Sequence, residues 1–186
     1  MNSAAFPAHI TGFVSKLSSV ICSYEKGEHN QGHSLLCSGE TLLIPSRTYC
    51  LELSGGVFQA LSYTEQSIVA CWFTRHHNGH VREKYLRKLT TFDRDWVIAY
   101  VMALCGEYVM DILTYIWEHR DIFDRLVLQR WLRDNRLFYS QTRSRIVSYW
   151  DCYYRSSFPR FEDYVGSRLM TFFDDCLWNR QSQESC

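Results

Sequence analysis

Apolar residues recur every three or four positions along most of this chain, which is the spacing of one buried face on an α-helix. The first run begins after Pro7, a residue suited to a first helical turn, and ends at Gly27. Its apolar side chains are Ile10, Phe13, Val14, Leu17, Val20, Ile21 and Tyr24. Because its other face carries polar residues such as Lys16 and Lys26, this run predicts an amphipathic helix that packs against a core.

Capping signals divide residues 62–178 into further helices, each with an apolar face of its own. The predicted starts are Ser62 with Glu65 in capping-box spacing, Asp93 or Asp95, Asp121 and Ser140. The predicted ends fall near the Asn78–Gly79 turn, at Gly106 and at Asn135. The last helix is predicted from Phe161 to Leu177.

Residues 28–60 do not keep the helical period. The short apolar pieces of this segment are interrupted by Gly32, Gly39, Pro45 and the pair Gly55–Gly56. Brief helical turns and a small strand pair both fit such a pattern. Glycine-rich surface loops often carry function, so this segment is also a place to look for a site.

The length of 186 residues is close to that of one domain. We therefore predict one all-α domain over residues 1–180, with the irregular segment at about 28–60 inside it and a frayed polar tail at 181–186. Two arrangements of the helices are open at this point: stacked helical hairpins and an irregular helical bundle. The choice depends on whether the helices follow a repeat.

A repeated order of signals between residues 78 and 118 bears on this choice. A helix is predicted to begin at Val81–Arg82, and a turn that contains aspartate leads to a second helix. After a glycine, the pattern that began at Val81 starts again at Val109. The segments in question are His80–Leu89, Asp93–Val97, Tyr100–Leu104 and Tyr108–Leu113. Their order resembles HEAT-type α-helical repeats, whose hairpins stack into an α-solenoid with a broad surface for partners.

The resemblance also implies a role for two charged residues. Arg82 and Asp95 fall where the family has its arginine and aspartate, so it implies a buried polar link between adjacent repeats. This role is structural and not catalytic. The second unit has Met110 in place of the arginine, and the flanking segments do not keep the period. A compact helical bundle is therefore the alternative to a true solenoid.

Composition narrows the class of partner. Lys plus Arg equals Asp plus Glu at 20 each, so no net charge draws the whole chain toward nucleic acid or an anionic membrane. The eight cysteines form no CxxC pair, and the first residues do not have the pattern of a signal peptide. No run approaches the roughly 18 apolar residues of a membrane span. We expect a soluble cytoplasmic protein that does not associate with a membrane.

The sequence contains no strong catalytic or metal-binding motif. The candidate metal ligands are His76, His77, His80 and Glu83, which combine imidazole and carboxylate groups suited to a divalent ion. Their spacing matches no established motif and includes a predicted turn, so a solvated polar loop is the preferred interpretation. We expect no metal site and no cofactor, and we favour a noncatalytic role.

One local charge pattern predicts a binding surface. Arginines alternate with aromatic residues between positions 125 and 150, and guanidinium groups beside aromatic rings suit phosphates and unstacked bases. The predicted binding residues are Arg125, Arg130, Trp131, Arg133, Arg136, Tyr139 and Arg143. Asp121, Asp124 and Asp134 dilute the positive charge, so an ion-paired helix face is the simpler interpretation of the same residues.

These observations favour a noncatalytic protein-interaction module. Small bacterial chains of this build serve as adaptors, inhibitors or immunity proteins, a class that the resemblance implies. The expected partner is another protein. The alternative is a nucleic-acid-binding helical-repeat protein that uses the arginine and aromatic region at 125–150. The sequence leaves the oligomeric state undetermined.

Overall fold

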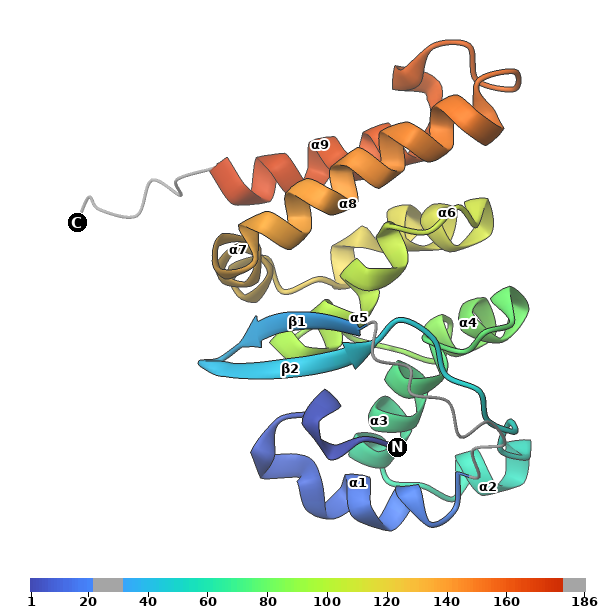
Figure 1. Cartoon of the computed structure of the whole chain (residues 1–186), viewed down its shortest axis with the longest axis vertical. Coiled ribbons are helices and arrows are strands. Elements are labelled where there is room, and N and C mark those ends of the chain that lie inside the picture. The colour runs from blue at the N-terminus through green and yellow to red at the C-terminus, as the bar shows by residue number, and fades with distance from the viewer. Residues whose placement is uncertain (22–31, 179–186) are drawn as a thin grey trace, which may run out of the picture.

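The computed structural model describes residues 1–21 and 32–178, and it is mostly helical with one small antiparallel sheet. The helices follow one another along the long axis of the molecule, from α1 (Thr11–Ser18) at one end to α9 (Val165–Trp178) at the other (Figure 1). The predicted mostly helical chain is confirmed. The two-stranded sheet is an addition to the all-α class.

The remaining elements lie between these two helices. The strands are β1 (Gly32–Cys37) and β2 (Glu40–Pro45). The other α-helices are α2 (Gly55–Gln59), α3 (Tyr63–Phe73), α4 (Gly79–Leu86), α5 (Asp95–Cys105), α6 (Met110–Glu118), α7 (Arg125–Asp134) and α8 (Arg136–Tyr149). Short 3₁₀ turns are found at Ser3–Ala5, Ala8–Ile10, Arg120–Ile122 and Phe161–Asp163, and a π-helical turn at Trp150–Tyr154 extends α8.

Two of the predicted helix signals are confirmed. The Ser62 side chain accepts a hydrogen bond from the backbone N–H of Glu65, and the Glu65 carboxylate accepts one from the backbone N–H of Ser62, which is a complete capping box. Helix α5 ends at Cys105, directly before Gly106. The predicted end of the first helical run at Gly27 lies outside the described residues, as does the tail at 181–186.

Three predicted starts, at Phe161, Asp121 and Ser140, are wrong. Phe161 opens a 3₁₀ turn, and α9 begins only at Val165. Asp121 lies in a 3₁₀ turn, and Asp124 caps α7 instead by accepting hydrogen bonds from the backbone N–H groups of Leu126 and Val127. The helix cannot begin earlier because Phe123 is extended and pairs with another segment of the chain. Ser140 lies inside α8, since only one residue separates α7 from α8 and that helix is already under way.

The irregular segment contains a β-hairpin. Strands β1 and β2 pair in antiparallel register, with Leu35 opposite Leu42. They are joined by Ser38 and Gly39, both at positive φ (47° and 85°), as a two-residue turn of the I′ kind requires. Burial alternates along both strands, so the inner face packs on the core and the outer face is exposed. Of the two readings left open for this segment, the strand pair is present, and the short helix α2 follows it.

Helix α5 forms the centre of the core. Ten of its eleven residues are buried, all except Asp95. It contacts α3, α6, α7, α8 and β1, so it has no face left for solvent and shows no amphipathic pattern. Helix α9 packs across α6, α7 and α8. None of the helices within residues 1–21 and 32–178 combines the length and apolar character that crossing a membrane requires.

The cysteines in the described ranges act as core residues. All six are free thiols, and every one except Cys152 is buried. Burial raises the pKa of Cys37 to about 12 and that of Cys71 well above its usual value, so these thiols stay protonated at neutral pH. They therefore contribute as small hydrophobic side chains.

A salt bridge joins the first helix to the capping box. Lys16 of α1 lies 2.7 Å from the carboxylate of Glu65, which is buried at the start of α3. The hydrogen bond from Lys16 and those from Ser62 lower the pKa of Glu65 to about 2. The same carboxylate thus caps α3 and holds α1 against it.

We predict that Glu65→Gln removes an acid-sensitive part of the folding stability. The unfolded carboxyl titrates near 4.5 and the folded one near 2, so its contribution is complete above pH 4.5 and is lost as the pH falls toward 2. Thermal unfolding at about pH 7 and about pH 3 measures this loss. Wild type should lose more stability between the two than Glu65→Gln, whereas Glu118→Gln, at an exposed carboxylate, should follow wild type. Equal losses in all three proteins would contradict the assignment.

Candidate binding groove

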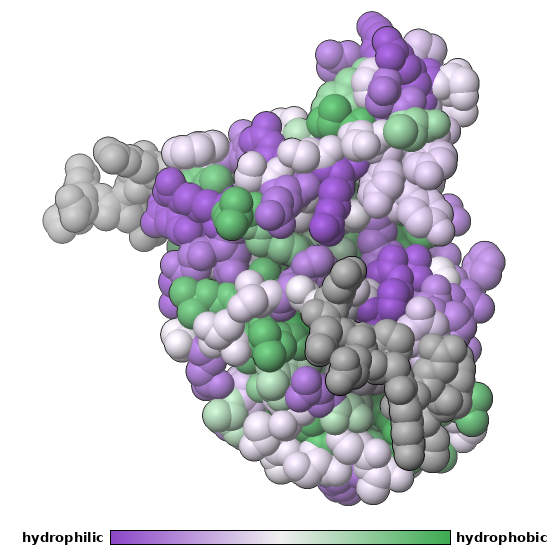
Figure 2. Space-filling model, in the orientation of Figure 1, coloured by the Kyte–Doolittle hydropathy of each residue, from purple (hydrophilic) through white to green (hydrophobic). Residues whose placement is uncertain are grey.

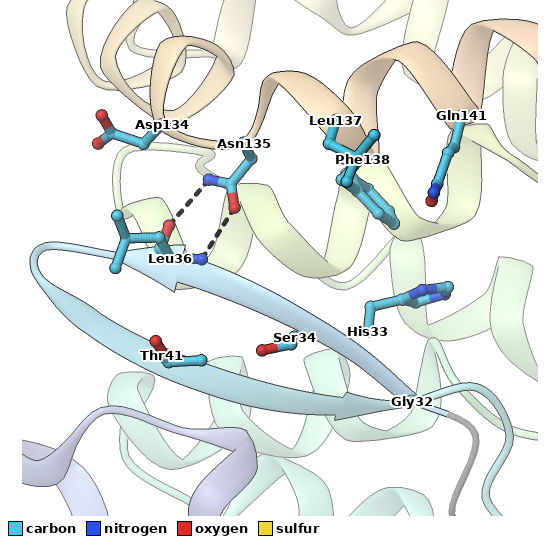
Figure 3. A pocket seen from close by; sticks show the side chains of 10 residues that line it. All are labelled: Gly32, His33, Ser34, Leu36, Thr41, Asp134, Asn135, Leu137, Phe138 and Gln141. Carbon is cyan, nitrogen blue, oxygen red and sulfur yellow. Dashed lines mark hydrogen bonds between the residues drawn. The ribbon is translucent and has the colours of Figure 1, made fainter.

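A groove of about 440 Å³ lies between the hairpin and the start of α8 (Figure 3). Its lining residues are Gly32, His33, Ser34, Leu36, Thr41, Asp134, Asn135, Leu137, Phe138 and Gln141. One wall is β1, the edge strand on this side of the sheet, and the other is the first turns of α8. Hydrophobic patches are visible on this side of the molecule, over the hairpin and the neighbouring helices (Figure 2). The groove is therefore open to solvent and mixed in polarity.

Asn135 closes one end of the groove by acting as a strand partner. Its Oδ1 accepts a hydrogen bond from the backbone N–H of Leu36 at 2.8 Å, and its Nδ2 donates to the carbonyl of Leu36 at 2.9 Å. The same amide also donates to the carbonyl of Trp131, which fixes it at the junction of α7 and α8. One side-chain amide thereby satisfies both backbone groups that Leu36 turns away from β2.

Ser34, the next residue of β1 whose backbone N–H and C=O point away from β2, has no such hydrogen-bond partner among the residues that the structure describes. Along an antiparallel strand, residues bonded to the partner strand alternate with residues whose N–H and C=O point away. Leu36 belongs to the second kind, so Ser34, two residues earlier, turns its backbone groups the same way. Within the described ranges of the chain, neither backbone group of Ser34 is hydrogen-bonded. The groove therefore exposes an unpaired stretch of strand edge.

The other end of the groove is positively charged. The ring of His33 packs against Phe138 with 4.9 Å between ring centroids. Burial, together with the positive charges of Arg75, Arg145 and Arg47, lowers the pKa of His33 to about 4, so the imidazole is neutral at pH 7. Every charge that shifts this pKa is positive. The electrostatic potential at this end is therefore favourable for an anion.

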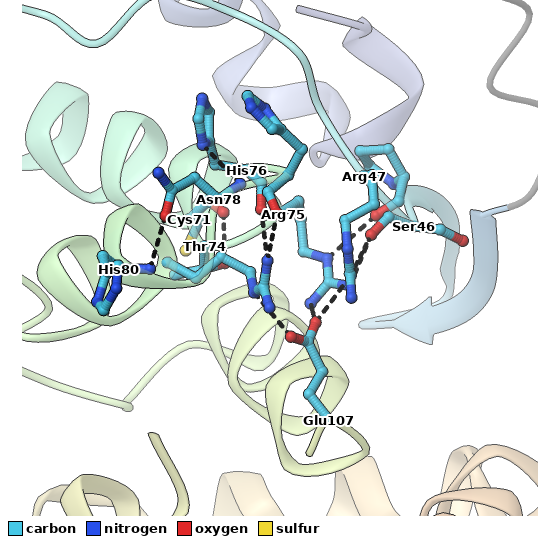
Figure 4. Close-up of polar contacts among 12 residues, drawn as sticks. Ser46, Arg47, Cys71, Thr74, Arg75, His76, Asn78, His80 and Glu107 are labelled. Atoms are coloured by element: carbon cyan, nitrogen blue, oxygen red, sulfur yellow. Dashed lines mark hydrogen bonds and ion pairs between the residues drawn. The ribbon is translucent and has the colours of Figure 1, made fainter. Parts of the chain in front are cut away.

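The source of this potential is a buried charge cluster centred on Glu107 (Figure 4). The Glu107 carboxylate is 5% exposed and lies 2.7 Å from Arg82, 3.0 Å from Arg75 and 2.9 Å from Arg47. Arg75 and Arg82 are buried, while the side chain of Arg47 is 33% exposed. One carboxylate thus faces three guanidinium groups, and the cluster has an excess of positive charge.

The cluster also holds together three distant segments of the chain. Arg75, at the end of α3, donates hydrogen bonds to the carbonyls of Pro45 and Ser46 after β2. Arg82 donates to two carbonyls of the turn between α3 and α4. Glu107 follows α5. The hairpin, the α3–α4 turn and the end of α5 therefore all contact one carboxylate or its arginines. Burial lowers the pKa of Arg75 to about 10, so this guanidinium group is still charged at pH 7.

Arg145 adds a further cation beside this cluster. It lies on α8, one helical turn beyond Gln141, which lines the groove. Its side chain covers Gly106, the neighbour of Glu107: a Cβ on that glycine would lie 3.4 Å from Arg145 Cδ and 3.7 Å from Nη1. Arg145 is exposed, and in the part of the chain that the structure describes it forms no ion pair.

The predicted metal ligands are not brought together. His76 is buried, its Nδ1 accepts a hydrogen bond from the backbone N–H of Asn78, and its Nε2 therefore donates to the carbonyl of Cys50. His77 stacks on Tyr49, and Glu83 forms an ion pair with Arg87. Within residues 1–21 and 32–178, no group of three histidine, cysteine or acidic side chains is placed to hold a metal ion.

The predicted arginine and aromatic surface is only partly a surface. Trp131 and Tyr139 are 1% and 3% exposed and belong to the core, so their rings do not form part of this surface. Helical geometry explains this, because both lie on the inward faces of α7 and α8. Arg143 pairs with Asp174. The remaining predicted residues, Arg125, Arg130, Arg133 and Arg136, are exposed.

Arg82 forms a buried link, but its partner is Glu107 and not Asp95. Asp95 begins α5 at the other end of that helix and accepts a hydrogen bond from Ser38 in the hairpin turn. The two residues therefore serve different contacts. The implied structural role of Arg82 is retained in a different pairing.

Sequence reasoning missed the residues that build the groove. A signal for the hairpin was present: Ser38–Gly39 is a turn dipeptide between two short apolar runs, and it predicts a two-residue hairpin. Asn135 was identified only as a helix end. Arg145 belongs to the arginine and aromatic pattern at 125–150, but that pattern does not place it beside the groove. Nothing local marks Glu107 or Ser34, because their surroundings are formed by distant segments.

Comparisons with known proteins do not identify this chain. No family model matches it, and neither a curated protein nor a solved structure shows detectable similarity to it.

We predict that Glu107→Gln destabilises the protein by about 3–5 kcal/mol, because it leaves two buried guanidinium groups without a counter-charge. Urea unfolding followed by circular dichroism measures the change. The control is Glu52→Gln, which breaks an exposed pair with Lys84 and should cost less than about 1 kcal/mol. If both substitutions cost the same, Glu107 is not the central element of the cluster.

Proposed function

We propose that this protein is a noncatalytic protein-interaction module that binds an extended segment of another protein along the edge of β1. The observation that supports this most directly is the unpaired backbone of Ser34 inside an open groove. An unpaired strand edge binds another strand through main-chain hydrogen bonds, a mode known as β-augmentation.

Asn135 supports this proposal by showing what the edge accepts. Its side-chain amide has the same donor and acceptor as a peptide group. It forms hydrogen bonds with the N–H and C=O of Leu36 in the way that a neighbouring strand would. A segment entering the groove can continue this pattern at Ser34. Its backbone then supplies one donor and one acceptor where the described residues supply neither.

The groove also offers apolar contacts for side chains of the bound segment. Leu36 is 36% exposed and Leu137 is 75% exposed, on opposite walls. Successive side chains of a strand point to opposite faces, so one set contacts these leucines while the other set faces solvent. Affinity then comes from the shared backbone pattern, and specificity from the side chains that cover the leucines.

The finer classification stays a prediction. Helix α5 is surrounded on all sides, and this favours the irregular helical bundle over the HEAT-like solenoid. Neither arrangement changes the proposal, because the groove is formed by the hairpin and α8. In the alternative of nucleic-acid binding, Trp131 and Tyr139 cannot stack on bases, since both are buried. Roles as an adaptor, inhibitor or immunity protein are all compatible with such a module.

We predict that Ser34→Pro abolishes binding of linear peptides selected on this protein from a displayed random library. Proline removes the N–H that pairs with the bound strand, and edge strands tolerate it. The matched control is Leu43→Pro, because Leu43 lies directly opposite Ser34 and turns its own N–H toward the other edge of the sheet. Binding is measured by fluorescence polarisation with the selected peptides, and circular dichroism verifies that both variants fold.

Hydrogen exchange gives a second measurement that needs no substitution. A bound peptide should slow exchange of the Ser34 amide in wild type. If the library yields no binder, or if Leu43→Pro reduces binding as much as Ser34→Pro, the β1 edge is not the docking site. Retardation of short DNA or RNA at low salt, together with no peptide binding, would instead favour the nucleic-acid alternative.

A further inference from the structure

We infer that the groove selects an extended segment that places an anionic side chain, a carboxylate or a phosphate, beside Arg145 and Arg47 near the His33 end of the groove. This inference deepens the proposed function and depends on it. It specifies the partner by chemistry: a strand-forming peptide with an acidic or phosphorylated residue at one position.

Positive charges outnumber negative charges in the cluster beside the His33 end of the groove. Three guanidinium groups, those of Arg47, Arg75 and Arg82, surround a single carboxylate, that of Glu107, and the side chain of a fourth arginine, Arg145, covers the neighbouring Gly106. The first three share this carboxylate, so each is only partly neutralised. An additional anion at this place relieves repulsion among the cations and does not need a new buried counter-charge.

The arginines differ in how accessible their guanidinium groups are to a ligand. Arg75 and Arg82 are buried and committed to backbone carbonyls. Arg47 is one-third exposed and Arg145 is exposed, so these two can turn their free N–H groups toward a ligand. Guanidinium groups bind carboxylate and phosphate oxygens in pairs, with hydrogen bonds about twice as strong as those between neutral groups.

The residues that would contact the bound segment are aligned along one side of α8. Asn135, Phe138, Gln141 and Arg145 follow one another on successive turns of α8. The first binds Leu36, the second packs on His33, and the third lines the groove. At a rise of about 1.5 Å per helical residue, Arg145 lies about 15 Å along the helix from Asn135. An extended chain spans that distance in roughly four or five residues.

The bound segment is thus expected to have a simple pattern. Apolar residues contact the leucines near Asn135, the backbone pairs with Ser34, and an anionic residue follows roughly four or five positions away from the Asn135 end. His33 stands between the two parts of this pattern. Its ring contributes a polar surface beside Phe138, and it is neutral at pH 7, so it does not add to the charge.

The test uses the displayed peptide library and synthetic versions of one selected peptide. We expect selected sequences to be enriched in Asp or Glu at a single position. A synthetic peptide with Glu or phosphoserine there should bind wild type about tenfold more tightly than the same peptide with Gln. Arg145→Gln should remove this difference. Arg168→Gln, at an exposed arginine of α9 that does not line the groove, should keep it.

A spectroscopic readout follows the charged end by itself. Histidine resonances give the pKa of His33, and an anion beside it should raise this pKa from about 4 toward its usual value. Inorganic phosphate is the probe, added to wild type and to Arg145→Gln at constant ionic strength. The shift is expected in wild type and should be smaller in the variant.

The outcomes separate this inference from the proposed function. If peptides bind but Glu, phosphoserine and Gln versions bind equally, the anion site is overturned and strand addition stands. If Arg145→Gln weakens the Gln peptide as much as the Glu peptide, the arginine does not recognise charge, and the inference is again overturned. If no peptide binds at all, both proposals fail. A preference for phosphoserine over Glu identifies phosphate as the preferred anion.

Discussion

The ion pairs of one buried carboxylate hold the centre of this molecule together. Glu107 faces Arg47, Arg75 and Arg82, which come from the end of the hairpin, the end of α3 and the start of α4. Burying charged groups is costly unless they are paired and hydrogen-bonded, and here the arginines also bind backbone carbonyls that would otherwise lack donors. The position of the hairpin, and so of the groove, depends on this arrangement.

The hairpin shows how a small element becomes a binding surface. A two-stranded sheet is marginal by itself, so β1 and β2 need the core beneath their inner face. The helices cover that face, and among the described residues the outer backbone edge of β1 is hydrogen-bonded to the side chain of Asn135 at Leu36 and not at Ser34. A strand edge that is paired at one residue and open at the next is a defined place for another strand to begin. The excess positive charge at its far end then favours one kind of residue in that strand.

The particular errors of the sequence analysis have a common cause. The apolar period predicted the helices well, and the capping box at Ser62 and the stop at Gly106 are purely local signals. Asp121 failed as a cap because Phe123 is held extended by a distant segment. The alternation of arginine and aromatic residues around Trp131 and Tyr139 predicts a surface, but it does not show which face of each helix points inward.

The helical class, most helix positions and the interruption at residues 28–60 can be predicted from local patterns, because the hydrophobic period, caps and turn residues act over a few neighbouring positions. Packing in three dimensions was needed to show that the interruption is a hairpin against α5, that three arginines surround Glu107, and that Asn135 pairs with Leu36 across 99 positions of sequence. Charge pairs and strand edges depend on distances in space. Such distances are set only when the helices pack, so local sequence patterns do not predict them.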